Sequence, residues 1–157
     1  MSMSPAESFS VEYGGPGQLA TWAMEQLGQV KPIGVIDHML VVKRRAEVRG
    51  VVLLTDLTDN NVMMHVASDG SAAWINHEAL AQIFSFVFGA LHLGRATGLV
   101  HSENARSINF MEHIGFVRET QIANFTSQGD LLIYAMWRNN CRWIGPSWDS
   151  HGQTLLH

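Results

Sequence analysis

The hydrophobic and polar positions near the middle of the chain predict a strand followed by a helix. Residues 95–101 carry β-branched side chains between small ones, which is typical of a short strand. Ser102 or Asn104 offers a side-chain acceptor for the free N–H groups that open the next helix. That helix should run to about Ile114, because Gly115 supplies the left-handed backbone that ends helices.

The same patterns place the other elements along the chain. Helical spacing predicts helices over residues 16–27 and 77–91, with Asn76 as the cap of the second. The predicted strands, each bounded by polar turns, lie at 34–42, 48–55, 61–68, 116–124 and 130–137. Hairpins followed by strands that alternate with helices predict an α+β fold with a mixed sheet.

Length and composition narrow the class of protein. A chain of 157 residues with 46% hydrophobic and 15% charged residues is expected to be one soluble globular domain. Residues 1–15 and the tail 139–157 lack periodicity and are expected to be irregular. The net charge of −4 argues against broad nucleic-acid binding. A single cysteine, Cys141, and the lack of a membrane-length apolar run predict a cytoplasmic protein with no membrane partner.

An ordered set of residues carries a family resemblance. Its members are Phe88, Leu91 and Arg95, then Asn104 and Ser107, then Gly115-Phe116, and finally Gly129-Asp130 with Leu132-Ile133-Tyr134. In residue type and spacing the set resembles the GNAT family of N-acetyltransferases over roughly residues 33–143. The similarity is greatest to the branch that acetylates ribosomal-protein N-termini and to small phage-encoded relatives. The resemblance implies a GNAT-like sheet of six to seven strands with flanking helices, splayed into a V between the two central strands.

The resemblance also implies that acetyl-CoA is the cosubstrate and enters this V. The backbone of Met64, Val66 and Ser68 would pair with the pantetheine amides, and Asn104 and Ser107 would lie along the same arm. The diphosphate would meet the loop and helix start that follow, because a helix N-terminus offers unpaired N–H groups and a partial positive charge. The residues expected there are Gly70, Ser71, Trp74, Asn76 and His77.

Four positions depart from the family pattern. Ala72 and Trp74 stand where relatives place loop glycines, and Asp69 stands where they place a basic residue. Met111 stands where many relatives have a tyrosine that protonates the departing thiolate, and a thioether cannot donate a proton. An inactive GNAT-like binding or structural protein, for example a phage component, is therefore the alternative to an enzyme. A third, weaker alternative is an enzyme that binds a different ligand in the same cleft.

Candidate catalytic residues follow from the need for a base near neutral pKa. His65 is best placed, on the strand that would hold the cofactor, since an unperturbed histidine has a pKa of about 6.5. His101 and Glu103, at the end of strand 95–101, are the other candidates. The alternative for His65 is a strand histidine hydrogen-bonded within the sheet.

The partners are less sharply defined by the sequence. The acceptor would be a primary amine, on a protein or a small molecule, that attacks the thioester directly. The eight histidines lack the pairings that metal ligands favour, which predicts no metal site. An apolar helix and a tryptophan-bearing tail are compatible with a homodimer.

Overall fold

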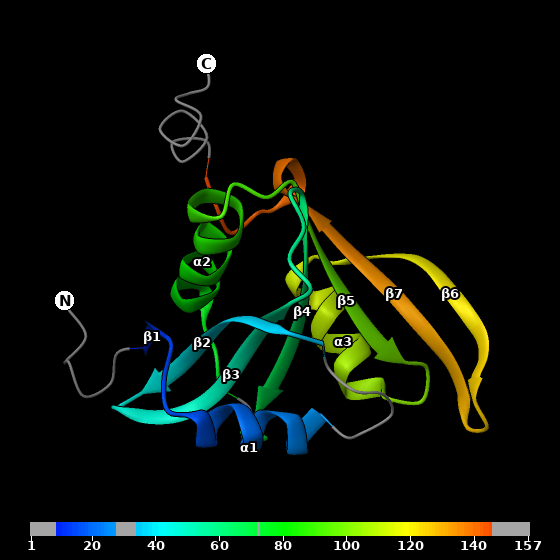
Figure 1. Ribbon diagram of the computed structural model, residues 1–157, viewed down its shortest axis with the longest axis horizontal. Coiled ribbons are helices and arrows are strands. Elements are labelled where there is room, and N and C mark those ends of the chain that lie inside the picture. Colours follow the sequence, from blue (N-terminus) through cyan, green and yellow to red (C-terminus); the bar gives the residue numbers. More distant parts are fainter. Residues whose placement is uncertain (1–8, 28–33, 72, 146–157) are drawn as a thin grey trace.

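The computed structural model describes residues 9–27, 34–71 and 73–145, and a seven-stranded sheet runs through its centre (Figure 1). The strand order is β1-β2-β3-β4-β5-β7-β6. The strands are β1 (Phe9–Tyr13), β2 (Ile36–Arg44), β3 (Glu47–Thr55), β4 (Asn61–Ser68), β5 (Arg95–His101), β6 (Val117–Thr126) and β7 (Gly129–Trp137). Neighbouring strands pair antiparallel except β4 and β5, which are parallel. The predicted α+β class and mixed sheet are confirmed.

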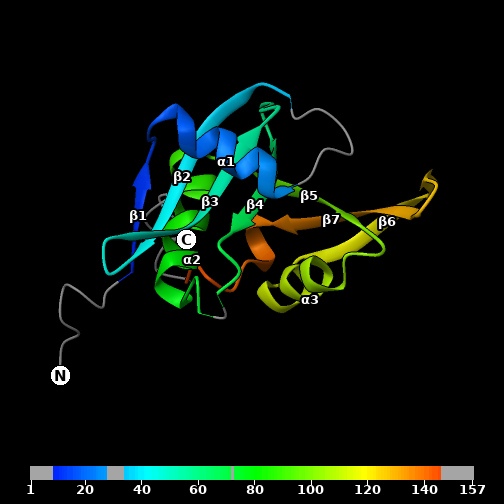
Figure 2. The same cartoon turned by 90° about the horizontal axis from the view of Figure 1, so that it is seen from below.

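Helices cover both faces of this sheet. They are α1 (Gly17–Leu27), α2 (His77–Ser85) with its π-helical continuation η2 (Phe86–Ala90), α3 (Ala105–Ile114) and the 3-10 turn η3 (Arg138–Asn140). Figure 2 shows α1 on one side of the sheet and α2 and α3 on the other. The larger hydrophobic cluster lies on the side of α2 and α3, and a smaller one lies beneath α1. Among the described residues, no helix is long and apolar enough to span a membrane.

Local signals predicted the centre of the chain well. Strands β4 and β5 have the predicted bounds, and α3 ends at Ile114 as expected. Gly115 follows with φ of 108°, the left-handed conformation that a glycine adopts without strain. Asn104 caps α3, because its side chain accepts a hydrogen bond from the Ser107 N–H.

Two expectations about local structure were wrong. Residues 9–13 were expected to be irregular but form β1, an edge strand in which Val11 alone is buried, so it shows no clear alternation. The helix expected over 77–91 is α-helical only to Ser85 and then widens into η2. Single π-helical turns, with i→i+5 hydrogen bonds, are rare inside helices, so a helical hydrophobic pattern does not predict one. The outer parts of the expected irregular ends, 1–8 and 146–157, lie outside the described residues.

The predicted splay between the central strands is present. The paired residues of β4 and β5 are Asn61↔Arg95, Val62↔Ala96 and Met63↔Thr97. Beyond Met63 and Thr97 the two strands part, although β4 continues to Ser68 and β5 to His101. The V-shaped sheet is therefore confirmed, and its apex lies at the Met63–Thr97 pair.

A polar network holds the strands together at this apex. Arg95 donates two hydrogen bonds to the Glu119 carboxylate on β6, at 2.8 and 2.6 Å. Its Nε also donates to the Thr97 hydroxyl at 2.9 Å, which in turn donates to the Asn61 side chain at 2.7 Å. The chain of contacts thus joins β4, β5 and β6 where the gap begins.

Candidate active site

A cleft of about 360 Å³ opens where β4 and β5 separate. Residues 64–68 of β4 and 99–101 of β5 form two of its walls, and the loop after β4, the start of α3 and the end of α1 complete it. Along these stretches the two strands do not pair with each other. A ligand that carries amide groups can therefore hydrogen-bond to the facing strand edges without breaking the sheet.

Side-chain alternation divides the cleft between the two faces of the sheet. On β4, Met64 and Val66 belong to the cluster on the α2 and α3 side, so His65 points to the opposite side, toward α1. On β5, the methyl group of Met111 on α3 packs against Gly98. His101, an odd number of residues from Gly98, therefore points to the α1 side as well. Both histidines share one side of the cleft, and α3 lies on the other.

The start of α3 supplies the polar groups on its side. Asn104, Arg106 and Ser107 all line the cleft. A Cβ atom added to Gly70 would lie 3.8 Å from the Arg106 guanidinium, so this cation extends toward the loop after β4. Within the described part of the chain, no hydrogen bond or ion pair engages that guanidinium. Sequence reasoning missed Arg106, although a cation in the first turn of a helix opposes the helix dipole and was a usable signal.

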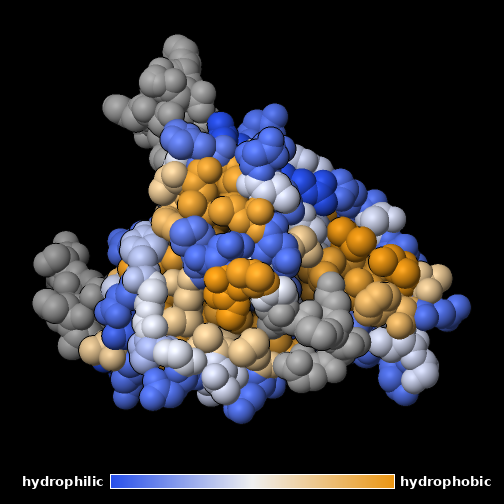
Figure 3. Space-filling model, viewed as in Figure 1, coloured by the Kyte–Doolittle hydropathy of each residue, from blue (hydrophilic) through white to orange (hydrophobic). Residues whose placement is uncertain are grey.

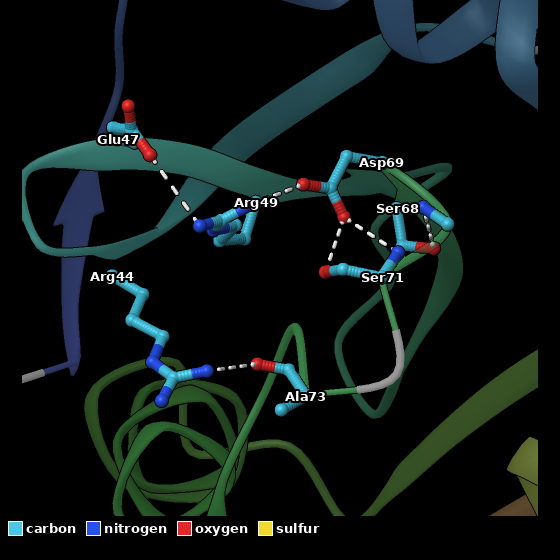
Figure 4. Close-up of polar contacts among 8 residues, drawn as sticks. Arg44, Glu47, Arg49, Ser68, Asp69, Ser71 and Ala73 are labelled. Carbon is cyan, nitrogen blue, oxygen red and sulfur yellow. Dashed lines mark hydrogen bonds and ion pairs between the residues drawn. The ribbon is translucent and has the colours of Figure 1, made fainter.

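The loop after β4 is closed on itself by Asp69 (Figure 4). The Ser71 N–H and hydroxyl both donate to Asp69 Oδ1, at 2.9 and 2.6 Å, and Arg49 donates to Oδ2 at 3.0 Å. The Gly70 N–H donates to the Ser68 hydroxyl at 3.3 Å. Burial acts to raise the pKa of Asp69, but the hydrogen bonds from Ser71 and Arg49 outweigh it and hold that pKa below its usual value. Two N–H groups suited to a phosphate thus already bind side chains of the loop.

Trp74, rather than the start of α2, reaches the cleft. Its side chain is buried, stacks at a tilt on Phe110 at 5.4 Å and covers Gly50, where a Cβ atom would collide with the indole. Ser71, Asn76 and His77 were expected beside the diphosphate, but none of the three lines the cleft. The His77 ring packs instead against Trp143 at 5.1 Å. Trp74 forms part of the wall and leaves the cleft open.

Two of the three candidate bases reach the cleft. His65 and His101 line it, and Glu103 does not. The Glu103 carboxylate is exposed and accepts a 3.4 Å hydrogen bond from the Ser102 hydroxyl. His101 lies 6.2 Å from the Phe125 ring, and its Nδ1 is buried without a hydrogen-bond partner among the described residues.

His65 makes a hydrogen bond within the sheet, as the alternative for it stated, and the sequence did not identify its partner. Its Nε2 lies 3.1 Å from the hydroxyl oxygen of Thr55 on β3. That hydroxyl donates to the Asp56 carboxylate at 2.8 Å. The two strands place Thr55 diagonally across from His65, ten residues away in the chain, where no local pattern connects them.

The cleft contains no phenol for protonating a thiolate. Met111 lines it as a buried thioether, and the chain's two tyrosines, Tyr13 and Tyr134, lie elsewhere. In the described ranges there is also no group of three or more His, Cys, Asp or Glu side chains that would hold a metal ion.

Solved N-acetyltransferase structures share this fold at low sequence identity. A variant of the spermidine N-acetyltransferase SpeG from Vibrio cholerae matches with a TM-score of 0.69 and 12% identity, over 88% of this chain and 98% of that one. The ribosomal-protein-S5-alanine acetyltransferase from Vibrio fischeri gives a TM-score of 0.56 and 18% identity, over 69% and 64% of the two chains. N-acetyltransferase PseH from Campylobacter jejuni, solved in complex with acetyl coenzyme A, gives a TM-score of 0.54 and 11% identity, over 64% of this chain and 67% of that one.

The fold is that of the GNAT N-acetyltransferases. The fold that the sequence resemblance predicted is therefore confirmed. Neither a family model nor a curated protein sequence matches the chain. At 11–18% identity the structural likeness establishes the fold alone, so the roles of individual residues rest on the geometry of the cleft.

Proposed function

We propose that this chain is an acetyl-CoA-dependent N-acetyltransferase in which a primary amine attacks the thioester directly. The observation that carries the proposal is the separation of β4 and β5 beyond Met63 and Thr97, which leaves a cleft at their unpaired edges. A pantetheine arm is narrow and carries two amides, so it suits a gap bordered by backbone donors and acceptors.

The donor would lie on the α3 side of the cleft. Its amides would pair with the edge of residues 64–68, and Asn104 and Ser107 would lie along the arm. Arg106 would offer its guanidinium to the diphosphate, because among the described residues it is the arginine or lysine that lines this cleft, and it extends toward Gly70. This assignment moves the phosphate contact from the loop after β4 to the first turn of α3.

The amine would enter from the α1 side, which faces the reader in Figures 1 and 3. His65 and His101 point to this side, the end of α1 borders it, and Figure 3 shows hydrophobic side chains on the surface over β5 and β7. The backbone N–H near Val66 would stabilise the oxyanion of the tetrahedral intermediate. The departing thiolate would take its proton from water, because Met111 has none to give.

A second candidate function is ligand binding without acetyl transfer. The closure of the loop by Asp69 favours it, because a carboxylate occupies the Ser71 N–H group that a phosphate would otherwise use. The thioether of Met111 favours it too, since the cleft lacks a proton donor for the thiolate at that position.

Calorimetric and thermal titration with acetyl-CoA, followed by mass spectrometry of amine acceptors, tests both functions. A ligand at about 100 times its Kd should stabilise the fold by about 2.7 kcal/mol. Arg106→Gln should weaken acetyl-CoA binding about tenfold, or about 1.4 kcal/mol. Lys43→Gln, a matched change at an ion pair with Glu12 outside the cleft, should leave binding unchanged. No binding at millimolar acetyl-CoA would exclude the transferase, and binding without any acetylated amine would favour the second function.

A further inference from the structure

Strands β5, β7 and β6 extend beyond helix α1 on that helix's side of the sheet. Helix α1 packs on β3 and β4, where Val51, Leu53 and Ala67 belong to the smaller hydrophobic cluster. Figure 2 shows β7 and β6 continuing past the helix. Within the described part of the chain, no helix packs over the α1 side of β6 and β7.

Apolar side chains occupy this side of the three strands. Leu99 on β5 points there, as His101 does, and β7 pairs Ile133 directly with Leu99. Leu99 and Ile133 are partly buried, and neither belongs to a hydrophobic cluster of the core. On β6, Ile122 is 44% exposed and pairs with Leu131, two residues before Ile133, so it points to the same side.

Phe125 completes this surface and joins it to the cleft. Its side chain is 36% exposed, and its ring lies 6.2 Å from the ring of His101. Leu99 and His101 both line the cleft, so the surface continues into it. The distance from β5 across β7 to β6 is two strand spacings, about 10 Å. We call this surface the apolar face; it consists of Leu99, Ile122, Phe125 and Ile133.

The charges around the apolar face do not favour a polycation. Arg95 and Glu119, at the apex of the gap, bind each other through hydrogen bonds of 2.8 and 2.6 Å. Among the described residues, Asp69 is the acid that lines the cleft, and its carboxylate is already hydrogen-bonded within its own loop. Glu103 is exposed beyond the end of β5 and does not line the cleft. A second ammonium group on the acceptor would therefore gain little from the cleft itself.

We propose that the acceptor is a small primary amine with an apolar body, an alkylamine or an arylalkylamine, whose hydrocarbon part lies on the apolar face. The inference rests on the proposed function, which supplies the acetyl donor. Hydrocarbon gains free energy on leaving water, whereas the backbone of a peptide acceptor would lose hydration there without finding partners. Apolar surroundings also favour the uncharged form of an amine, and only that form has the lone pair that attacks.

The transfer balances with such an acceptor. The lone pair of the neutral amine forms the new C–N bond, and the thioester C–S bond breaks with its electron pair on sulfur. One proton leaves the nitrogen and one reaches the thiolate through water. The products are a neutral amide and the free thiol of coenzyme A.

Acetylation of hexylamine and of hexamethylenediamine, which differ by one terminal amino group, measures the preference. The kcat/KM for hexylamine should be about tenfold or more higher, because the terminal ammonium of the diamine would lose hydration on the apolar face. From propylamine to hexylamine, KM should fall about twofold for each added methylene, as expected for partial burial. An equal or higher kcat/KM for the diamine would overturn the proposal, and so would a KM that does not change along the series.

Ile122→Glu tests the apolar face itself, because it places a carboxylate there at an exposed position outside the cleft lining. The variant should lower kcat/KM for hexylamine severalfold and shift the preference toward the diamine. Leu57→Glu makes a similar change at a leucine that is 41% exposed and does not line the cleft, and it should alter neither value. A natural preference retained in Ile122→Glu contradicts the assignment. If sedimentation then shows that this variant has lost a dimer, the face is an interface between two copies of the chain.

Binding without turnover separates this inference from the proposed function. Methyl NMR of the natural chain, titrated with hexylamine with and without coenzyme A, should show saturable shifts at Leu99, Ile122 and Ile133. Hexamethylenediamine should cause smaller shifts at the same concentrations. If these shifts appear but no acetyl group is transferred, the proposed function fails and the apolar face still binds the amine. If amines are acetylated but millimolar hexylamine causes no shift at these residues, the present inference alone is wrong.

Discussion

Helices α2 and α3 begin in the same way but differ in what they present to the cleft. Asn76 accepts a hydrogen bond from the Ala79 N–H at 2.9 Å, and Asn104 accepts one from the Ser107 N–H at 3.1 Å. The start of α3 lines the cleft, whereas the start of α2 does not. Trp74 reaches the cleft two residues before the Asn76 cap.

The difference shows that a capped helix start becomes a binding site only where packing leaves it accessible. Both N-termini carry the partial positive charge of a helix dipole. At α2 the preceding indole is buried against Gly50 and Phe110, and the first helical residue, His77, packs on Trp143. At α3 the first turn presents Arg106 and Ser107 to the open gap. Four substitutions test this contrast.

Trp74→Ala should have the largest effect. Removing a buried tryptophan leaves a cavity beside Gly50 and Phe110, and such truncations lower the free energy of unfolding by about 3–5 kcal/mol. Urea denaturation measures the loss. Trp22→Ala, at a partly buried position on α1, is the matched control and should cost clearly less. An equal or smaller loss for Trp74 would show that its ring does not fill the space in front of α2.

Replacing the two caps separately should give equal stability losses but unequal binding. Asn76→Ala and Asn104→Ala should each lower the free energy of unfolding by about 1 kcal/mol, because each removes one capping hydrogen bond. Acetyl-CoA affinity, measured by calorimetry, should fall severalfold only in Asn104→Ala. A similar fall in Asn76→Ala would contradict the separation of α2 from the cleft.

Asp69→Asn should have the smallest effect on stability. Unlike Asn104→Ala, it should strengthen acetyl-CoA binding. The change removes a negative charge from the cleft wall and weakens the hold on the Ser71 N–H, so acetyl-CoA should bind a few times more tightly. The folded-state pKa of Asp69 is lowered, so its stabilising contribution is present above the unfolded value of about 3.9 and is lost as the pH falls through the folded value.

Urea denaturation of both proteins between pH 3 and pH 7 checks the stability part of this prediction. The natural chain should be the more stable near neutral pH, and the difference should shrink below about pH 4. A difference that grows on acidification would contradict the assigned direction of the pKa shift. Ser71→Ala is the matched control for Asp69→Asn, because it removes the hydroxyl contact to Asp69 and leaves the charge of Asp69 in place.

Whether the sequence predicted a site residue depended on how far apart in the chain its contacts lie. Asn104 and Ser107, expected from the resemblance, and His65 and His101, expected from residue type, all line the gap. Asn76 and His77 do not line it, and the His77 ring packs on Trp143, which lies 66 residues further along the chain. The roles of all these residues in binding and catalysis stay predictions until the variants above are measured.

The amino-acid sequence alone determined most of the elements and the ends of β4, β5 and α3, because caps, glycine stops and side-chain alternation depend on neighbours within about four residues. It also carried the order of strands and helices from which the fold class followed. Only the tertiary structure decided which helix start faces the cleft, how Asp69 closes its loop, and that Thr55 reaches His65. Those outcomes depend on contacts between segments that are distant in the chain or on how a loop packs, and no local pattern records such distances.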